Sequence, residues 1–188
     1  LLVLATICLL ITVLAIGIRG GNPAPKPADA APEPEMSLGQ ALGEALRHRG
    51  FLLLTAGFFV CGFQVAFIGV HLPAFAVLCG LPVAVGATGL ALIGLFNIIG
   101  SIGAGYLGGR MRPKFPLSLI YFGRAAAILP IVLFPVTEWV LLVFSAVMGL
   151  LWLSTVPLTN GVIAQIFGAR HLGMLFGIVF FSHQVGSF

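Results

Sequence analysis

The residues from 84 to 108 contain no charged side chain, and they form one of several long apolar runs in this sequence. A helix that crosses the hydrocarbon core of a bilayer needs roughly 17 to 25 apolar residues, because it rises about 1.5 Å per residue. Runs of this kind, separated by short polar or Pro/Gly breaks, cover residues 1–18, 51–78, 84–108, 117–134, 139–167 and 172–188. The sequence therefore predicts an all-α, polytopic membrane helical bundle with about six transmembrane helices.

The composition excludes most soluble classes of protein. The chain is 60% hydrophobic and 7% charged, whereas a soluble domain is about a quarter charged. The alternating segments of about ten residues that build a membrane barrel are not apparent. The net charge of +4 could suggest nucleic acid, but the cations cluster between the apolar runs. We therefore expect the lipid bilayer as a partner and no nucleic acid.

The cations also predict the topology. Lys and Arg occur in the connections 19–50, 109–116 and 168–171, whereas the loops near Leu81 and Thr137 carry neither. Because cytoplasmic loops collect Lys and Arg, these three connections are expected in the cytoplasm. The chain would then be a multi-pass protein of the cell membrane whose first span runs from outside to inside.

The connection after the first span differs from the others. Residues 20–36 are rich in Pro and Ala, which predicts an extended or disordered linker. Ser37 and Gln40 then have the spacing of a capping box, and the leucines and alanines of 38–46 fall on one helical face. This pattern favours a short amphipathic helix on the inner membrane surface. The alternative is the frayed start of the next span.

Small residues and prolines within the spans predict close packing and bends. Asn97, Ser101, Gly105 and Gly109 recur every fourth residue, a stripe along which another helix could approach closely. Three prolines each remove a backbone donor and invite a bend: Pro73, Pro130 and Pro157.

One span, a polar linker and five further spans resemble the middle and second half of a major facilitator superfamily transporter. That family joins two six-helix halves by a cytoplasmic linker. The resemblance implies that residues 1–18 are the last helix of the N-terminal half, 19–50 the linker with its short helix, and 51–188 a truncated C-terminal half. The apolar ends and the absence of an initial Met agree with an internal fragment, from helix six to helix eleven.

A basic motif supports this resemblance in part. The family carries G-x-x-x-D-R-x-G-R-K between helices eight and nine, and this sequence reads GYLGGRMRPK, in which Gly105, Arg110 and Lys114 match. Gly109 replaces the acid, so a charge latch through that acid is absent here. The stretches 57–75 and 175–188 further resemble monocarboxylate and oxalate/formate carriers. Several of those carriers use a basic residue in helix eight, and 84–108 has none.

Arg124 lies inside an otherwise apolar run, where an ionisable residue is a functional hypothesis by default. The resemblance places it on the ninth helix, outside the central cavity. Two interpretations stay open. Arg124 either snorkels or bonds carbonyls of a neighbouring helix, which we prefer, or it supplies charge for a substrate or gate.

Other polar residues are better candidates for substrate binding, because they converge near the bilayer midplane, where such transporters bind their substrates. These residues are Gln64, Asn97, Trp152, His183 and Gln184. His71 follows Gln64 by seven residues and shares its face nearer the outer end. Each could instead bond another helix, and Trp152 could simply pack. His183 is preferred because imidazole both donates and accepts, and titrates near physiological pH.

The sequence thus predicts a secondary active transporter that moves a small organic solute, with a carboxylate as one option, by alternating access. The alternatives are an intramembrane enzyme, a channel and a structural membrane subunit. No nucleophile–base pair, metal motif or cofactor motif is apparent, so neither enzyme activity nor a cofactor is expected. Because no Asp or Glu lies within a span, coupling to an ion such as H⁺ would use a histidine or another part of the protein.

Overall fold

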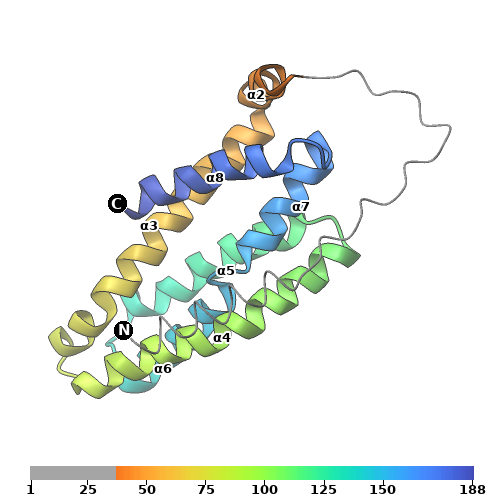
Figure 1. Ribbon diagram of the computed structural model, residues 1–188. Coiled ribbons are helices and arrows are strands. Elements are labelled where there is room, and N and C mark those ends of the chain that lie inside the picture. The colour runs from red at the N-terminus through yellow and green to blue at the C-terminus, as the bar shows by residue number, and fades with distance from the viewer. Residues whose placement is uncertain (1–36) are drawn as a thin grey trace, which may run out of the picture. The chain divides into compact units, whose positions relative to one another are not determined.

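The computed structural model describes residues 37–188, which are helical apart from short connections (Figure 1). The expected span 1–18 and the linker 20–36 lie outside the described residues. The helices are α2 (Leu38–Arg47), α3 (Arg49–Leu78), α4 (Val83–Arg110), α5 (Lys114–Leu133), α6 (Glu138–Leu151), α7 (Thr155–Phe167) and α8 (Leu172–Ser187).

Helix α2 is separate from α3, so the interpretation of 37–50 as a frayed helix start is wrong. The predicted capping box is confirmed: the Ser37 side chain accepts from the Gln40 amide, and the Gln40 side chain accepts from the Ser37 amide at 2.9 Å. His48 then adopts extended backbone angles and ends the helix. Ala41 and Ala45 are buried, whereas Leu38 and Leu46 are exposed. The alanines of the apolar face therefore pack against the protein, whereas its leucines Leu38 and Leu46 are exposed.

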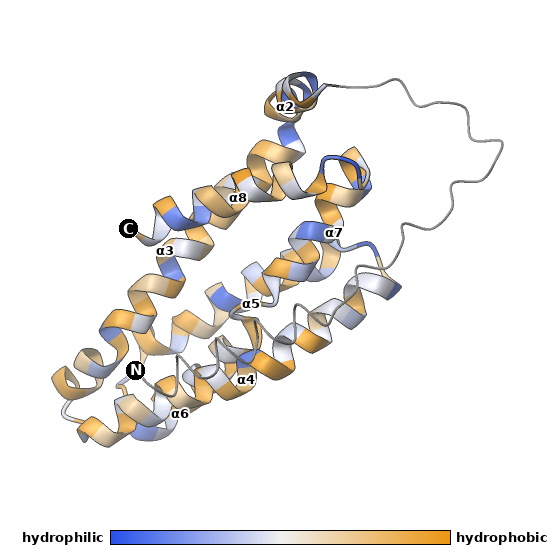
Figure 2. Cartoon of the chain, viewed as in Figure 1, coloured by the Kyte–Doolittle hydropathy of each residue, from blue (hydrophilic) through white to orange (hydrophobic). Residues whose placement is uncertain are grey.

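Four helical segments are long and apolar enough to cross a membrane, namely α3, α4, α5 and the segment Glu138–Phe167 that contains α6 and α7. α8 is apolar but shorter. Hydrophobic residues cover these helices, and hydrophilic residues gather on α2 and in the loops after α4 and α7 (Figure 2). The expected bundle is confirmed for residues 37–188, and the chain is a multi-pass membrane protein. The domain boundaries and the cytoplasmic side of each loop stay predictions.

Two tight helix pairs build the bundle, α3 with α8 and α4 with α6. Glycines let the backbones touch in both. A Cβ built on Gly62 of α3 would meet the His183 carbonyl of α8, and one built on Gly100 of α4 would meet the Leu150 carbonyl of α6. Where a side chain would strike backbone, only glycine permits the crossing.

The small-residue stripe on α4 contacts the described helices over only part of its length. A Cβ added to Gly105 or Gly109 would meet nothing within 4 Å among the described residues, so a helix contact at these two glycines stays a prediction. The close approaches on α4 occur instead at Gly86, beside Pro73, and at Gly100. A four-residue spacing drifts around a helix of 3.6 residues per turn, which carries the stripe away from the contact face.

The buried apolar side chains form two clusters, one near each end of the bundle. One cluster joins α2, α3, α4, α5, α7 and α8 around Phe51, Phe58 and Leu158. The other joins α3, α4 and α6 around Leu72, Leu141 and Met148. The polar groups around Arg124 lie between the two clusters.

Candidate functional site

The expected span 139–167 is broken in its middle. α6 ends at Leu151 and α7 begins at Thr155, so the break lies about halfway along the 30-residue segment. Pro157, in the first turn of α7, has no N–H to donate to the Leu153 carbonyl, which accepts from the Val156 amide instead at 3.0 Å. The bend predicted at Pro157 is confirmed as a break in the helix.

The break frees backbone groups that a continuous helix would pair. Ser154 Oγ donates to the Leu150 carbonyl. The Leu153 amide donates to Asn97 Oδ1 on α4 at 3.0 Å. The carbonyls of Leu151 and Trp152 both accept from the Arg124 guanidinium on α5. Side chains from two neighbouring helices therefore take over hydrogen bonds that the helix loses.

Arg124 is 1% exposed, and its five N–H donors match five contacts. Nε and one terminal nitrogen donate to the Leu151 carbonyl at 3.1 and 2.7 Å, and that terminal nitrogen also donates to the Trp152 carbonyl. The other terminal nitrogen contacts Cys61 Sγ at 3.1 Å and Gln64 Oε1 at 3.4 Å, both on α3. Arg124 therefore bonds carbonyls of a neighbouring helix, as one interpretation of the sequence predicts, and does not snorkel.

The guanidinium charge is balanced by dipoles. Among residues 37–188 the two carboxylates are Glu44 on α2 and Glu138 at the start of α6, and Arg124 makes no ion pair with either. A buried cation without a carboxylate is costly unless oxygen acceptors surround it. The carbonyls of Leu151 and Trp152 and the Gln64 side chain provide these acceptors.

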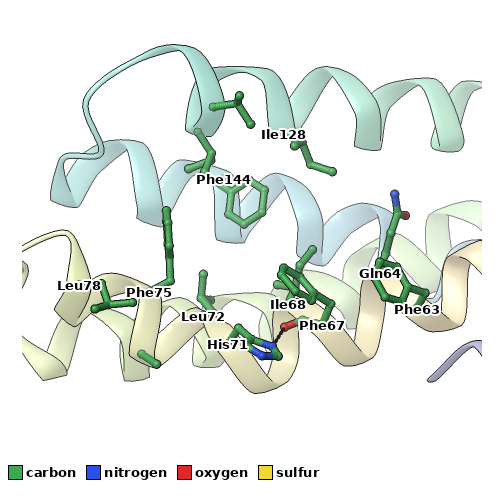
Figure 3. Close-up of a pocket in the computed structure, with 13 residues that line it drawn as sticks. Phe63, Gln64, Phe67, Ile68, His71, Leu72, Phe75, Leu78, Ile128 and Phe144 are labelled. Atoms are coloured by element: carbon green, nitrogen blue, oxygen red, sulfur yellow. Dashed lines mark hydrogen bonds between the residues drawn. The ribbon is translucent and has the colours of Figure 1, made fainter. Parts of the chain in front are cut away.

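Gln64 and His71 line one cleft, as their spacing predicts (Figure 3). The cleft has a volume of about 510 Å³ and lies between α3 and α5, with Phe144 of α6 among its lining residues. Figure 3 shows Gln64 at one end and Phe75 and Leu78 at the other. His71 Nδ1 bonds the Phe67 carbonyl at 2.9 Å. These two are the polar side chains in an otherwise apolar lining.

His183 and Gln184 lie on the far side of α3 from this cleft. The His183 backbone meets Gly62, which is two residues from Gln64 and so nearly opposite it on the helix. The His183 ring stacks on Phe180 and packs against Phe58, and its Nδ1 is buried without a partner among the described residues. Gln184 is exposed.

The structure thus groups four of the seven predicted site residues around the break, namely Arg124, Gln64, Asn97 and Trp152. The Trp152 side chain packs against the cluster around Met148, while its carbonyl faces Arg124. His71 joins this group through the cleft, whereas His183 and Gln184 do not. The binding roles of all seven residues stay predictions.

Sequence reasoning missed two members of the polar group. They are Cys61, whose Sγ contacts Arg124, and Thr155 of α7, whose hydroxyl lies 3.7 Å from Cys61 Sγ. The run Ser154, Thr155, Val156, Pro157 is typical of a helix start, with cap residues followed by proline in the first turn. That signal could have located the break. Groups of His, Cys, Asp or Glu able to hold a metal are absent from the residues that the structure describes.

Comparisons with known proteins agree on one family. The Major Facilitator Superfamily matches the chain over residues 1–188. A protein of Bacillus subtilis (strain 168), named "Uncharacterized MFS-type transporter YcxA", is 30% identical over 138 residues, which are 71% of this chain and 33% of that protein. The chain therefore corresponds to about a third of the length of this relative. No solved structure matches the chain.

Proposed function

Because the chain belongs to the Major Facilitator Superfamily, we propose that it forms part of a secondary active transporter that moves a small organic solute by alternating access. The chain would contribute the last helix of one half, the linker and most of the other half. Its connections 19–50, 109–116 and 168–171 would face the cytoplasm of a cell-membrane protein. The resemblance to monocarboxylate carriers makes small carboxylates the first solutes to test.

The broken helix carries this proposal. Transporters often bind substrates and ions near the bilayer midplane, at helices that are interrupted there. The α6–α7 break lies about halfway along its span, and polar groups from α3, α4 and α5 converge on it. A merely structural subunit has no need of a costly polar group at this depth.

Gln64 and His71 are the proposed solute contacts in the cleft. The Gln64 amide group has N–H donors in addition to the oxygen that Arg124 contacts, and the His71 ring has a second nitrogen besides the one that bonds the Phe67 carbonyl. The apolar lining would receive the carbon skeleton of a solute. Asn97, Trp152, His183 and Gln184 are proposed as further contacts, reached as the helices rearrange during transport.

Arg124 is a poor solute ligand in this conformation, since each of its N–H groups already has an acceptor within the protein. An anionic solute would have to displace the carbonyls of Leu151 and Trp152, for which the described residues offer no other hydrogen-bond donor. We therefore propose that the negative charge of a carboxylate is met by a histidine or by residues beyond this chain. H⁺ is the coupling ion that such a histidine would support.

Uptake into proteoliposomes tests the proposal. The full-length protein that contains this chain would be reconstituted and offered labelled small carboxylates and neutral solutes, with protein-free liposomes as the control. We expect saturable uptake of at least one solute, recovered chemically unchanged. Flux that rises linearly with concentration would indicate a channel, and conversion of the solute would indicate an enzyme. Either result would contradict the proposal.

A further inference from the structure

We propose that Arg124 and Asn97 form a two-sided clasp that holds the α6–α7 break, and that Arg124 is a positioning residue for transport. This inference rests on the proposed transport function. The clasp consists of the Arg124 contacts with the carbonyls of Leu151 and Trp152 and the Asn97 contact with the amide of Leu153. In this proposal the α6–α7 break is a hinge, and Arg124 fixes the angle between its two helices.

The first argument is the balance of backbone groups at the break. A break in a bilayer is tolerated only where the freed N–H and C=O groups find partners, because no water is present to bond them. From α4, Asn97 accepts from one freed donor, the Leu153 amide, and from α5, Arg124 donates to two freed acceptors, the carbonyls of Leu151 and Trp152. The two sides of the hinge are thus held by two different helices, and neither helix contains the hinge.

The second argument is that arginine suits this position better than lysine. The planar guanidinium presents five donors in a fixed fork. Here the fork reaches two carbonyls on one side and the α3 groups Cys61 and Gln64 on the other. A lysine ammonium has three donors on one atom and could not span both sides. The clasp therefore depends on the shape of the side chain as well as on its charge.

The third argument is that the clasp is joined to the cleft. Gln64 lines the cleft and accepts from Arg124 through Oε1. Cys61 contacts both Arg124 and Thr155, which is the first residue of α7. A solute that bonds Gln64 would change how firmly Arg124 holds the break, and a change at the break would reach α7. The network links an occupied cleft to the angle between α6 and α7.

The test combines hydrogen exchange with transport in the full-length protein held in lipid. Arg124→Lys keeps the charge but breaks the two-sided fork, and Arg47→Lys, on the exposed surface of α2, is the matched control. Amide exchange is followed by mass spectrometry in peptides that cover 148–160, with 172–187 as the reference region. Uptake gives the maximal rate and the half-saturating concentration of the solute.

We expect Arg124→Lys to raise exchange at the break about tenfold without changing it in 172–187, because the clasp acts locally. The maximal uptake rate should fall about tenfold, and the half-saturating concentration should stay within about twofold. Arg47→Lys should behave as the wild type does. If Arg124→Lys fails to insert, Asn97→Ala removes the other side of the clasp. Exchange in 148–160 against 172–187 then decides the matter, because Asn97 is also a proposed solute contact and its uptake kinetics would mix the two roles.

Several results would overturn the inference. A rise in half-saturating concentration for anions alone, with exchange unchanged, would make Arg124 the counter-charge of the solute. Faster amide exchange across all helices would show that Arg124 stabilises the whole fold and has no specific effect on the break. Unchanged amide exchange at the break in Arg124→Lys would show that Arg124 does not hold the break. If the wild type moves no solute at all, the transport proposal fails on its own, and the exchange result still decides whether the clasp exists.

Discussion

Arg124 shows how far a single residue can be interpreted from sequence. An arginine in an apolar run has to be paired, and the sequence narrows its role to carbonyl bonding or to substrate charge. The sequence cannot supply the partners, since Leu151 and Trp152 offer backbone atoms that any residue would offer. Their availability depends on the break, about 27 residues further along the chain. The identity of the side chain thus predicts that a buried arginine needs hydrogen-bond acceptors, and the tertiary structure determines which groups provide them.

Gln64→Leu should raise the half-saturating solute concentration about tenfold, because it removes the proposed hydrogen bond between Gln64 and the solute in an apolar cleft. Uptake by the reconstituted full-length protein checks this change. Gln165→Leu, at an exposed position of α7, is the control and should leave uptake unaltered. Equal half-saturating concentrations for wild type and Gln64→Leu would remove Gln64 from the proposed site.

His183→Phe keeps an aromatic ring between Phe58 and Phe180 but removes both ring nitrogens. If His183 contacts the solute or carries a proton, the maximal uptake rate should fall about tenfold while the midpoint of thermal unfolding stays unchanged. Both quantities are measured on the same purified protein. Unaltered uptake would mean that His183 serves only to pack α8 against α3.

At the scale of elements, hydropathy predicted the helices closely. The expected spans 51–78, 84–108 and 172–188 agree with α3, α4 and α8 to within two residues, and 117–134 differs from α5 by three residues at its start. Hydropathy did not place the α6–α7 break, because Trp152 and Leu153 keep the run apolar through it, whereas Pro157 predicted a bend close by. Helix ends can be predicted from local capping residues, whereas this break is also held by Asn97 and Arg124 from other helices.

Gly62→Leu should separate α3 from α8, because the new side chain would strike the His183 carbonyl. Overpacking of this kind costs about 1–3 kcal/mol. Gly69→Leu is the control on the same helix, where nothing among the described residues lies within 4 Å of the added Cβ. The midpoint of thermal unfolding in detergent should fall for Gly62→Leu only. A similar midpoint for both variants would contradict the close α3–α8 crossing.

At the scale of the whole molecule, the chain matches about a third of the length of its Bacillus subtilis relative. The family, the helical class and the membrane location followed from long apolar runs and short loops. The hydrogen-bond partners of each polar residue could not be predicted in this way, because they come from helices far apart in the sequence. Asn97 and Leu153, which share a hydrogen bond, are separated by 56 positions.

The 188-residue chain alone should not transport solute, because alternating access requires two halves that rock around one site. Reconstituted by itself and assayed with the solute panel, it should give the flux of protein-free liposomes. The full-length protein in a parallel preparation shows that reconstitution works. Solute accumulation by the chain alone would show that the described helices suffice for transport.

Solute exchange across the membrane tests alternating access most directly. Proteoliposomes holding the full-length protein are loaded with unlabelled solute, and entry of a trace of labelled solute is measured. After releasing label inside, an alternating site must return to face outward, and internal solute lets it make that return in the loaded form. Where the loaded site reorients faster than the empty one, internal solute should accelerate entry of the label about tenfold. Label entry that is indifferent to internal solute would contradict an alternating-access transporter.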